Sequence, residues 1–209
     1  MAPLVRPFLR RVAQPMMRAA WLFAIAASLA VPAAGLAQTP EERLAACVEC
    51  HGVEGSATTP ETPSLAGQPA DCLRVQLFLF REGLRPSEVM APQAEGLSDA
   101  ALRDLAAHFA ALEHLSPPSP GELDPEAYAR GQEVSADHRC AFCHLRDFSG
   151  RGQVPRLAGQ REDYLVKALE DYKSGRRPGY EPAMAEVMAT VPAAAIPDLA
   201  HYLAHFDGG

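Results

Sequence analysis

Apolar residues recur at helical spacing along most of the chain after about residue 38, whereas extended alternating runs are scarce. This periodicity predicts amphipathic helices and an all-α fold. Glycines at 83 and 175 and long loops at 52–69 and 150–160 separate the helical stretches. The apolar positions that define two of the helices are Leu73, Leu77, Phe80, Leu165, Leu169 and Tyr172.

Helix-start signals precede the apolar stretches. Thr39-Pro40-Glu41-Glu42 has the pattern of a capping box with proline at the first helical position. Asp124-Pro125 repeats that start later in the chain, and Ser98 precedes a stretch that directs Leu102, Leu105 and Phe109 inward. We therefore expect helices to begin at these three points.

The chain contains an internal repeat with an offset of 92 to 94 residues. The matching blocks are CVECHG (47–52) with CAFCHL (140–145), PSLAGQ (63–68) with PRLAGQ (155–160), 71–86 with 163–178, and 90–109 with 184–203. Four blocks in the same order predict two tandem domains, 38–115 and 124–209. The proline-rich segment 116–123 is predicted to be a short, stiff linker.

The first 37 residues have the layout of a secretory signal. Four arginines and no acidic residue precede the apolar run Ala19–Ala34, and the small residues Gly35 and Ala37 follow. An uncleaved membrane anchor is the alternative, but the run is short for a spanning helix and is broken by Pro32. We predict a signal peptide over 1–37, cleaved after Ala37, and a periplasmic protein.

Charge excludes one class of partner. The chain carries a formal net charge of −7, and loss of the four signal arginines leaves 15 basic and 26 acidic residues, a net charge of −11. Binding to nucleic acid depends on clustered Lys and Arg, so nucleic acid is not an expected partner.

The motifs CVECH and CAFCH admit three chemistries. A thioredoxin-like disulfide needs a βαβ context, and a zinc site would need both cysteine pairs, 93 residues apart, and would leave the histidines without a role. Cys-x-x-Cys-His is the attachment signature for c-type haem, with two thiols for the vinyl groups and an adjacent imidazole for the iron. The sequence therefore predicts two covalently bound haem c groups.

The second axial ligand is predicted from the repeat. Met90 and Met184 occupy matching positions just before the last helix of each half, while Met188 faces Ala94. A methionine opposite a histidine is the familiar pairing for electron transfer. Core packing of these methionines is one alternative. A bis-histidine haem that uses His138 or His201 is another.

Together the two CxxCH units, the PxLAGQ blocks and the matched methionines resemble a dihaem class I cytochrome c of the cytochrome c4 type, from about Ala45 to Phe206. The resemblance implies two tandem class I cytochrome c domains, each built around one covalently bound haem. It also implies approximate two-fold symmetry, haem propionates near the interface, and periplasmic electron transfer to or from membrane respiratory complexes. Carried over by position, the ligands are Cys47, Cys50, His51 and Met90 for the first haem, and Cys140, Cys143, His144 and Met184 for the second.

Two positions depart from this pattern. Cys72 stands where the second half has Tyr164, and Leu145 follows His144 where Gly52 follows His51. We expect Cys72 to be a small buried apolar residue in preference to a reactive thiol. The turn after His144 is expected to differ from the turn after His51.

An iron with two axial ligands has no place for substrate, so the chain is expected to be an electron carrier and not an enzyme. Its expected partners are redox proteins: a membrane respiratory complex, an oxidase or a dehydrogenase, with peripheral membrane association through them. The alternatives are an electron-transfer subunit of a larger sulfide or alcohol dehydrogenase, and a peroxidase-like enzyme if one methionine were not a ligand. Residues 38–116 carry 12 acidic and 5 basic residues, while 139–161 carry five arginines and one aspartate, which predicts oppositely charged docking surfaces.

Overall fold

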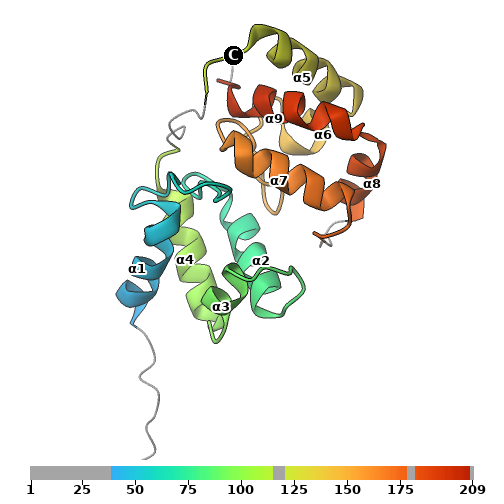
Figure 1. Cartoon of the computed structure of the whole chain (residues 1–209). Coiled ribbons are helices and arrows are strands. Elements are labelled where there is room, and N and C mark those ends of the chain that lie inside the picture. Colours follow the sequence, from blue (N-terminus) through green and yellow to red (C-terminus); the bar gives the residue numbers. More distant parts are fainter. Residues whose placement is uncertain (1–38, 115–120, 178–181, 208–209) are drawn as a thin grey trace, which may run out of the picture. The chain divides into compact units, whose positions relative to one another are not determined.

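The local sequence signals set the helix boundaries in the first half of the chain. The computed structural model describes residues 39–114, 121–177 and 182–207. The predicted signal peptide and most of the predicted linker therefore lie outside the described residues. Residues 39–114 hold the helices α1 (Pro40–His51), α2 (Ala70–Arg81), α3 (Met90–Ala94) and α4 (Asp99–Ala111) (Figure 1).

The predicted caps form at the starts of α1 and α4. The Glu42 amide donates to Thr39 Oγ1 over 3.2 Å, and the Thr39 amide donates to Glu42 Oε2 over 2.9 Å, which completes the capping box. The Ala101 amide donates to Ser98 Oγ over 3.2 Å. Both predicted starts are confirmed, and each satisfies amide groups that have no partner within the helix.

The described part of the second half holds α5 (Pro125–Asp137), α6 (Ala141–His144), α7 (Glu162–Lys173), α8 (Pro182–Thr190), the short 3₁₀ helix η1 (Ala193–Ala195) and α9 (Ile196–Ala204). Asp124 caps α5 as predicted, by accepting from the amides of Glu126 and Ala127. Unlike α1, α5 does not continue into the CxxCH motif. It ends at Asp137, and Arg139 follows in a left-handed conformation with φ 54° that a helix cannot contain.

The fold is all-α, as predicted: outside the helices, the described residues contain one isolated antiparallel bridge, between Arg151 and Val154. The second half has one large buried cluster, whereas the first half has two small ones. Small domains bury a modest share of their surface. Because its buried clusters are smaller, the first half depends more than the second on apolar contacts with a group other than its own side chains.

No single described helix is long and apolar enough to cross a membrane. The segments Pro182–Thr190 and Ala193–Ala204 reach the required length and composition only as a pair that is bent by 99°.

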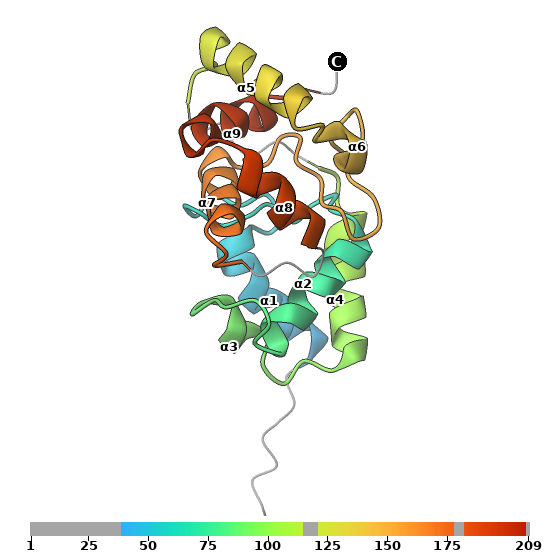
Figure 2. The same cartoon turned by 90° about the vertical axis from the view of Figure 1, so that its right-hand side faces the viewer.

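A close helix crossing organises the second half. Helix α5 lies across α9 in both views (Figures 1 and 2). The crossing is centred on Gly131, where an added Cβ would collide with the carbonyl oxygen of Asp198 and the side chain of Tyr202. One residue earlier, Arg130 forms a bidentate ion pair with Asp198, at 2.7 and 3.0 Å. The absence of a side chain at 131 thus allows the two helices to approach closely.

Replacing Gly131 tests this crossing. Gly131→Ala should lower the free energy of unfolding by about 1–3 kcal/mol, because the new methyl group meets backbone that cannot rotate away. Thermal unfolding followed by circular dichroism measures the loss. Gly121→Ala is the matched control, since no heavy atom lies within 4 Å of a Cβ at that position. Equal stability of the two variants would contradict the proposed close contact.

Candidate functional site

The first CxxCH motif forms the last turns of α1. Cys47 is partly buried, Cys50 is exposed, and His51 is only 6% exposed. The helix ends at Gly52, whose φ of 81° and ψ of 149° suit glycine, and whose amide donates to the Val48 carbonyl over 2.9 Å. An added Cβ at Gly52 would also collide with the carbonyl oxygen of Ser56. The motif is thus held between a regular helix and a glycine turn.

The second motif reaches a similar arrangement from a different helix. Cys140 precedes the short α6, Cys143 is exposed, and His144 is 7% exposed. Leu145 follows with φ 68° and ψ 166°, close to the angles of Gly52. The expectation that this turn would differ is wrong for the backbone. Leu145 instead adopts a conformation normally reserved for glycine, at a cost on the order of 1–3 kcal/mol.

Both motif histidines are oriented by a proline carbonyl. His51 Nδ1 donates to the carbonyl oxygen of Pro63 over 2.8 Å, and His144 Nδ1 donates to that of Pro155 over 2.9 Å. Because a carbonyl only accepts, Nδ1 carries the proton and Nε2 carries the lone pair suited to a metal. Burial lowers the pKa of both histidines, although each carbonyl contact raises it. Each ring is therefore held in a tautomer whose Nε2 could bind a metal.

The matched methionines border the same buried clusters as the first cysteine of each motif. Met90 and Cys47 pack against the cluster that contains Phe80 and Leu102. Met184 and Cys140 pack against the large cluster of the second half, and both methionines are partly buried. Met188 is 1% exposed and belongs to the core.

The two histidines considered as alternative ligands have other partners. His138 Nδ1 lies 3.1 Å from Thr190 Oγ1. His201 Nδ1 lies 3.0 Å from Glu162 Oε2, and His201 Nε2 accepts from the Asp124 amide over 3.0 Å. These contacts favour the methionines over a bis-histidine arrangement.

Two matching glutamines connect the halves by reciprocal hydrogen bonds. Gln68 donates to the Arg156 carbonyl and accepts from its amide, both over 3.0 Å. Gln160 donates to the Ser64 carbonyl over 2.9 Å and accepts from its amide over 2.8 Å. In the repeat, Gln68 matches Gln160 and Ser64 matches Arg156. One contact is thus made twice with the halves exchanged, as an approximate two-fold relation requires.

Two matching arginines, both partly buried, share one acceptor, the side-chain oxygen of Gln76. Arg85 donates to Gln76 Oε1 over 2.6 Å and to the Tyr164 hydroxyl over 3.3 Å, and Arg177 donates to Gln76 Oε1 over 3.1 Å. Within the described ranges, neither guanidinium pairs with a carboxylate. Burial lowers the pKa of Arg85, with a further contribution from the charge of Arg177. Two neighbouring, partly buried cations with no carboxylate partner among the described residues suit an anionic group beside them.

Arg85 and Arg177 also change the pKa of the neighbouring Tyr164 and Cys72 side chains. Burial raises the pKa of Tyr164, but Arg177 and Arg85 outweigh burial and lower it to about 8. Cys72 is 4% exposed, and burial raises its pKa to about 11 although the two arginines oppose the shift. A thiol with a raised pKa is unreactive, which agrees with the expected buried apolar role. At the position one helical turn after Cys72, Gln76 supplies the acceptor that Arg177 requires.

These residues fit haem c. Each half offers two cysteine thiols on one short stretch, a buried imidazole with Nε2 available as a ligand, and a methionine beside the same core. The buried guanidinium groups of Arg85 and Arg177 offer charge and hydrogen bonds to the propionates of such a group.

Comparison with known proteins agrees with this site. Residues 128–207 match the family model for cytochrome c. Cytochrome c4 of Thiocapsa roseopersicina is 33% identical over 160 residues, which cover 71% of this chain and 80% of the relative. The thiosulfate dehydrogenase electron acceptor of Thiomonas intermedia is 33% identical over 158 residues, 72% of each chain. The structure of reduced recombinant cytochrome c4 from Pseudomonas stutzeri aligns with a TM-score of 0.71 and 28% identity, over 81% of this chain and 100% of that one.

A repeated helical fold with two such motifs defines a dihaem c-type cytochrome, an electron carrier and not an enzyme. Its cofactors are two haem c groups, and its fold is a tandem of class I cytochrome c domains. The extent of the match to cytochrome c4 shows that the chain belongs to the cytochrome c4 family.

Sequence reasoning missed the residues that position the motif histidines. The carbonyls of Pro63 and Pro155 and the side chains of Gln68 and Gln160 all lie in the repeated PxLAGQ blocks. The sequence signal for these residues was the repeated PxLAGQ block, to which the sequence analysis assigned no structural role. Every residue has a backbone carbonyl, so residue type does not show which carbonyl accepts from a histidine. Only the position of Pro63 and Pro155 in the repeat could have indicated them.

The glutamine exchange gives a direct test. Gln160→Ala should lower the free energy of unfolding by about 1–3 kcal/mol, because the buried amide and carbonyl of Ser64 lose their partners. Urea unfolding of the protein with its haem groups measures this loss. Gln132→Ala, at an exposed position of α5, should leave the stability unchanged. A neutral Gln160→Ala would show that the exchange does not stabilise the connection.

Proposed function

We propose that this dihaem cytochrome is exported to the periplasm and passes single electrons between redox proteins through two His/Met-ligated haem c groups. The observation that carries the proposal is made in each half: the CxxCH motif holds a buried histidine on a proline carbonyl, and a methionine packs against the same core cluster as the first cysteine of that motif. Two such ligands leave no coordination position for a substrate.

We assign the residue roles by matching position. Cys47 and Cys50 would hold the first haem through thioethers, and His51 and Met90 would bind its iron. Cys140 and Cys143 would hold the second haem in the same way, and His144 and Met184 would bind its iron. The burial of each motif supports this division, since the second cysteine of each pair is exposed and the histidine is buried.

The bound iron supplies reversible one-electron chemistry, and the chain sets the conditions for it. Pro63 and Pro155 fix the tautomer of each imidazole through their carbonyl groups. The methionine thioether favours the reduced iron. The buried clusters keep water away from the ligands.

Export is supported by the sequence of the first 37 residues and by the chemistry of the cofactor site. The cationic and apolar segments predict a signal peptide that is cleaved after Ala37. The thiols of both CxxCH motifs then become available to haem outside the cytoplasm.

Exposed arginines around the second motif form a candidate docking surface. Arg139, Arg146 and Arg151 are exposed, and Arg139 lies 5.6 Å from the ring centroid of Phe142, which is 74% exposed. Arg161 does not belong to this surface, because it is 7% exposed and paired with Asp163 at 2.6 Å. The basic surface thus has three exposed members where the sequence suggested five. It suits an acidic partner such as a membrane respiratory complex, an oxidase or a dehydrogenase.

A second candidate function is that of an electron acceptor for one particular dehydrogenase. It is favoured by the relative from Thiomonas intermedia, which is a thiosulfate dehydrogenase electron acceptor. In that case the chain would co-purify with a sulfur-oxidising dehydrogenase and accept its electrons directly. A free carrier would purify alone and exchange electrons with several partners.

The methionine assignment is tested by substitution. Met90→Ala and Met184→Ala should each abolish the far-red methionine–iron absorption of one haem and lower its reduction potential, because the thioether that favours ferrous iron is lost. Met188→Leu, a volume-conserving change in the core, should leave both bands in place. Persistence of both bands in either alanine variant would rule out that methionine as a ligand.

The docking surface is tested by charge reversal. The double variant Arg146→Glu with Arg151→Glu should slow electron transfer to an acidic acceptor and flatten the dependence of the rate on ionic strength. Arg103→Glu, on the exposed side of α4, is the control and should change neither. An unchanged salt dependence in the double variant would exclude this surface as the docking site.

A further inference from the structure

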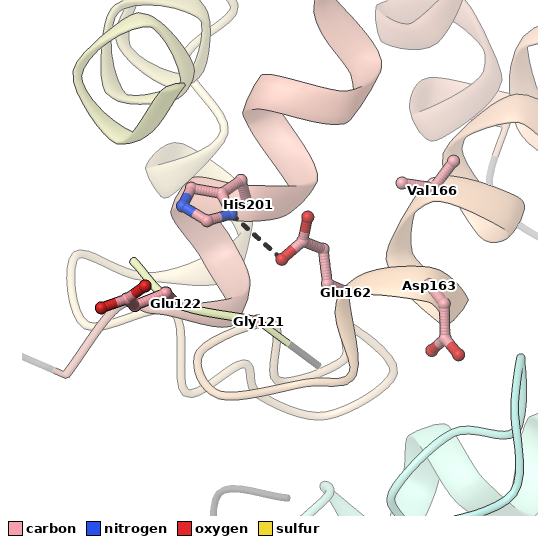
Figure 3. Close-up of a pocket in the computed structure, with 6 residues that line it drawn as sticks. All are labelled: Gly121, Glu122, Glu162, Asp163, Val166 and His201. Carbon is pink, nitrogen blue, oxygen red and sulfur yellow. Dashed lines mark hydrogen bonds and ion pairs between the residues drawn. The ribbon is translucent and has the colours of Figure 1, made fainter. Parts of the chain in front are cut away.

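Three potential metal ligands meet outside the haem sites. Glu162 begins α7, His201 lies in the last turn of α9, and His205 follows at the end of the same helix. One donor atom from each lies within 4.8 Å of the other two. Figure 3 shows the side chains of Glu162 and His201 turned toward one another, with Asp163 directed away from them.

The spacing of these groups is close to that of a zinc site. His201 Nδ1 lies 3.0 Å from Glu162 Oε2, and a ligand atom of His205 lies within 4.8 Å of the ligand atoms of both other residues. Ligands about 2.1 Å from a tetrahedral zinc ion are about 3.4 Å from each other, so side-chain shifts of roughly an ångström would complete the coordination. Two histidines four residues apart on a helix present their rings on one face, and these two ring centroids are 4.2 Å apart.

The second histidine has the tautomer of a ligand that binds through Nε2. His205 Nδ1 donates to the carbonyl oxygen of His201 over 3.0 Å, which fixes the tautomer that carries the lone pair on Nε2. Metal-binding histidines commonly make this backbone contact with the nitrogen that does not bind the metal.

The cytochrome fold does not require these three side chains. The repeat places Ala70, Ala107 and Ala111 of the first half opposite Glu162, His201 and His205. Ala70 and Ala107 lie in the corresponding helices α2 and α4. Since all three positions are alanine in a half with the same fold, the cluster is specific to the second half.

A pocket gives access to the cluster and room for further ligands. It has a volume of about 270 Å³ and is lined by Gly121, Glu122, Glu162, Asp163, Val166 and His201 (Figure 3). Asp163 is paired with Arg161 and is therefore not counted as a ligand. The Glu122 carboxylate adds negative charge that attracts a cation, and a water molecule can occupy a fourth coordination position.

We propose that Glu162, His201 and His205 form a binding site for a divalent transition metal ion, Zn²⁺ in particular, on the second half of this cytochrome. His201 Nε2 accepts a hydrogen bond from the amide of Asp124, the residue that caps α5. A metal bound at His201 Nδ1 shifts the ring proton to Nε2, which then can no longer accept from that amide. Metal binding therefore competes with the contact that holds the start of α5, and couples the site to the end of the connecting segment.

The test uses the dihaem protein, in which haem occupies the CxxCH cysteines, and Zn²⁺ as the probe. Equilibrium dialysis with metal analysis should find one zinc ion per chain. Glu162→Gln and His205→Ala should each lower the affinity about tenfold or more, since each removes one ligand. His108→Ala, which removes an exposed histidine from the equivalent helix α4, should leave the affinity unchanged.

X-ray absorption at the zinc edge identifies the ligands independently of affinity, and should find two imidazoles with oxygen ligands and no sulfur. The haem absorption spectrum of each variant confirms that it is folded. The proposal is overturned if the parent protein binds no zinc at micromolar concentrations, if folded Glu162→Gln and His205→Ala both retain the parent affinity, or if sulfur appears in the coordination shell.

Discussion

The exchange of hydrogen bonds between Gln68 and Gln160 is the constraint on which the arrangement of this cytochrome depends. Each glutamine holds the backbone of the opposite half at Arg156 or Ser64, one residue after the proline whose carbonyl orients a motif histidine. The connection between the halves and the orientation of the motif histidines therefore depend on adjacent residues of the same two loops. A displacement of one half would therefore shift the carbonyl groups that orient His51 and His144.

Sequence reasoning succeeded where a local chemical requirement selects a residue type. The caps at Thr39, Ser98 and Asp124 and the two CxxCH motifs are of this kind, and the repeat offset gave the rest of the helical order. It failed where the deciding group is backbone or lies far along the chain. The end of α5 depends on the left-handed turn at Arg139, and the role of Gln76 depends on Arg177, about a hundred residues away.

The two halves solve the same structural problem with different residues. A glycine makes the turn after His51, while Leu145 adopts nearly the same backbone angles after His144. Cys72 lacks the hydroxyl that Tyr164 provides, and Gln76 accepts from both buried arginines. Such differences show where one half has a contact or a group that the other lacks. The cluster of Glu162, His201 and His205, which is present in the second half alone, is one such difference.

The crossing of α5 and α9 at Gly131 also bears on the order in which the second half assembles. Gly131 meets Asp198, roughly 70 residues further along the chain, so this contact closes late and carries a large loop-closure entropy. CAFCH lies inside that loop and is synthesised before α9. The second motif therefore emerges into a domain that is still open, and the time between its emergence and the arrival of α9 is an interval during which both thiols are accessible from solution. In the first half, where α1 carries its own motif, that interval begins with the first described helix.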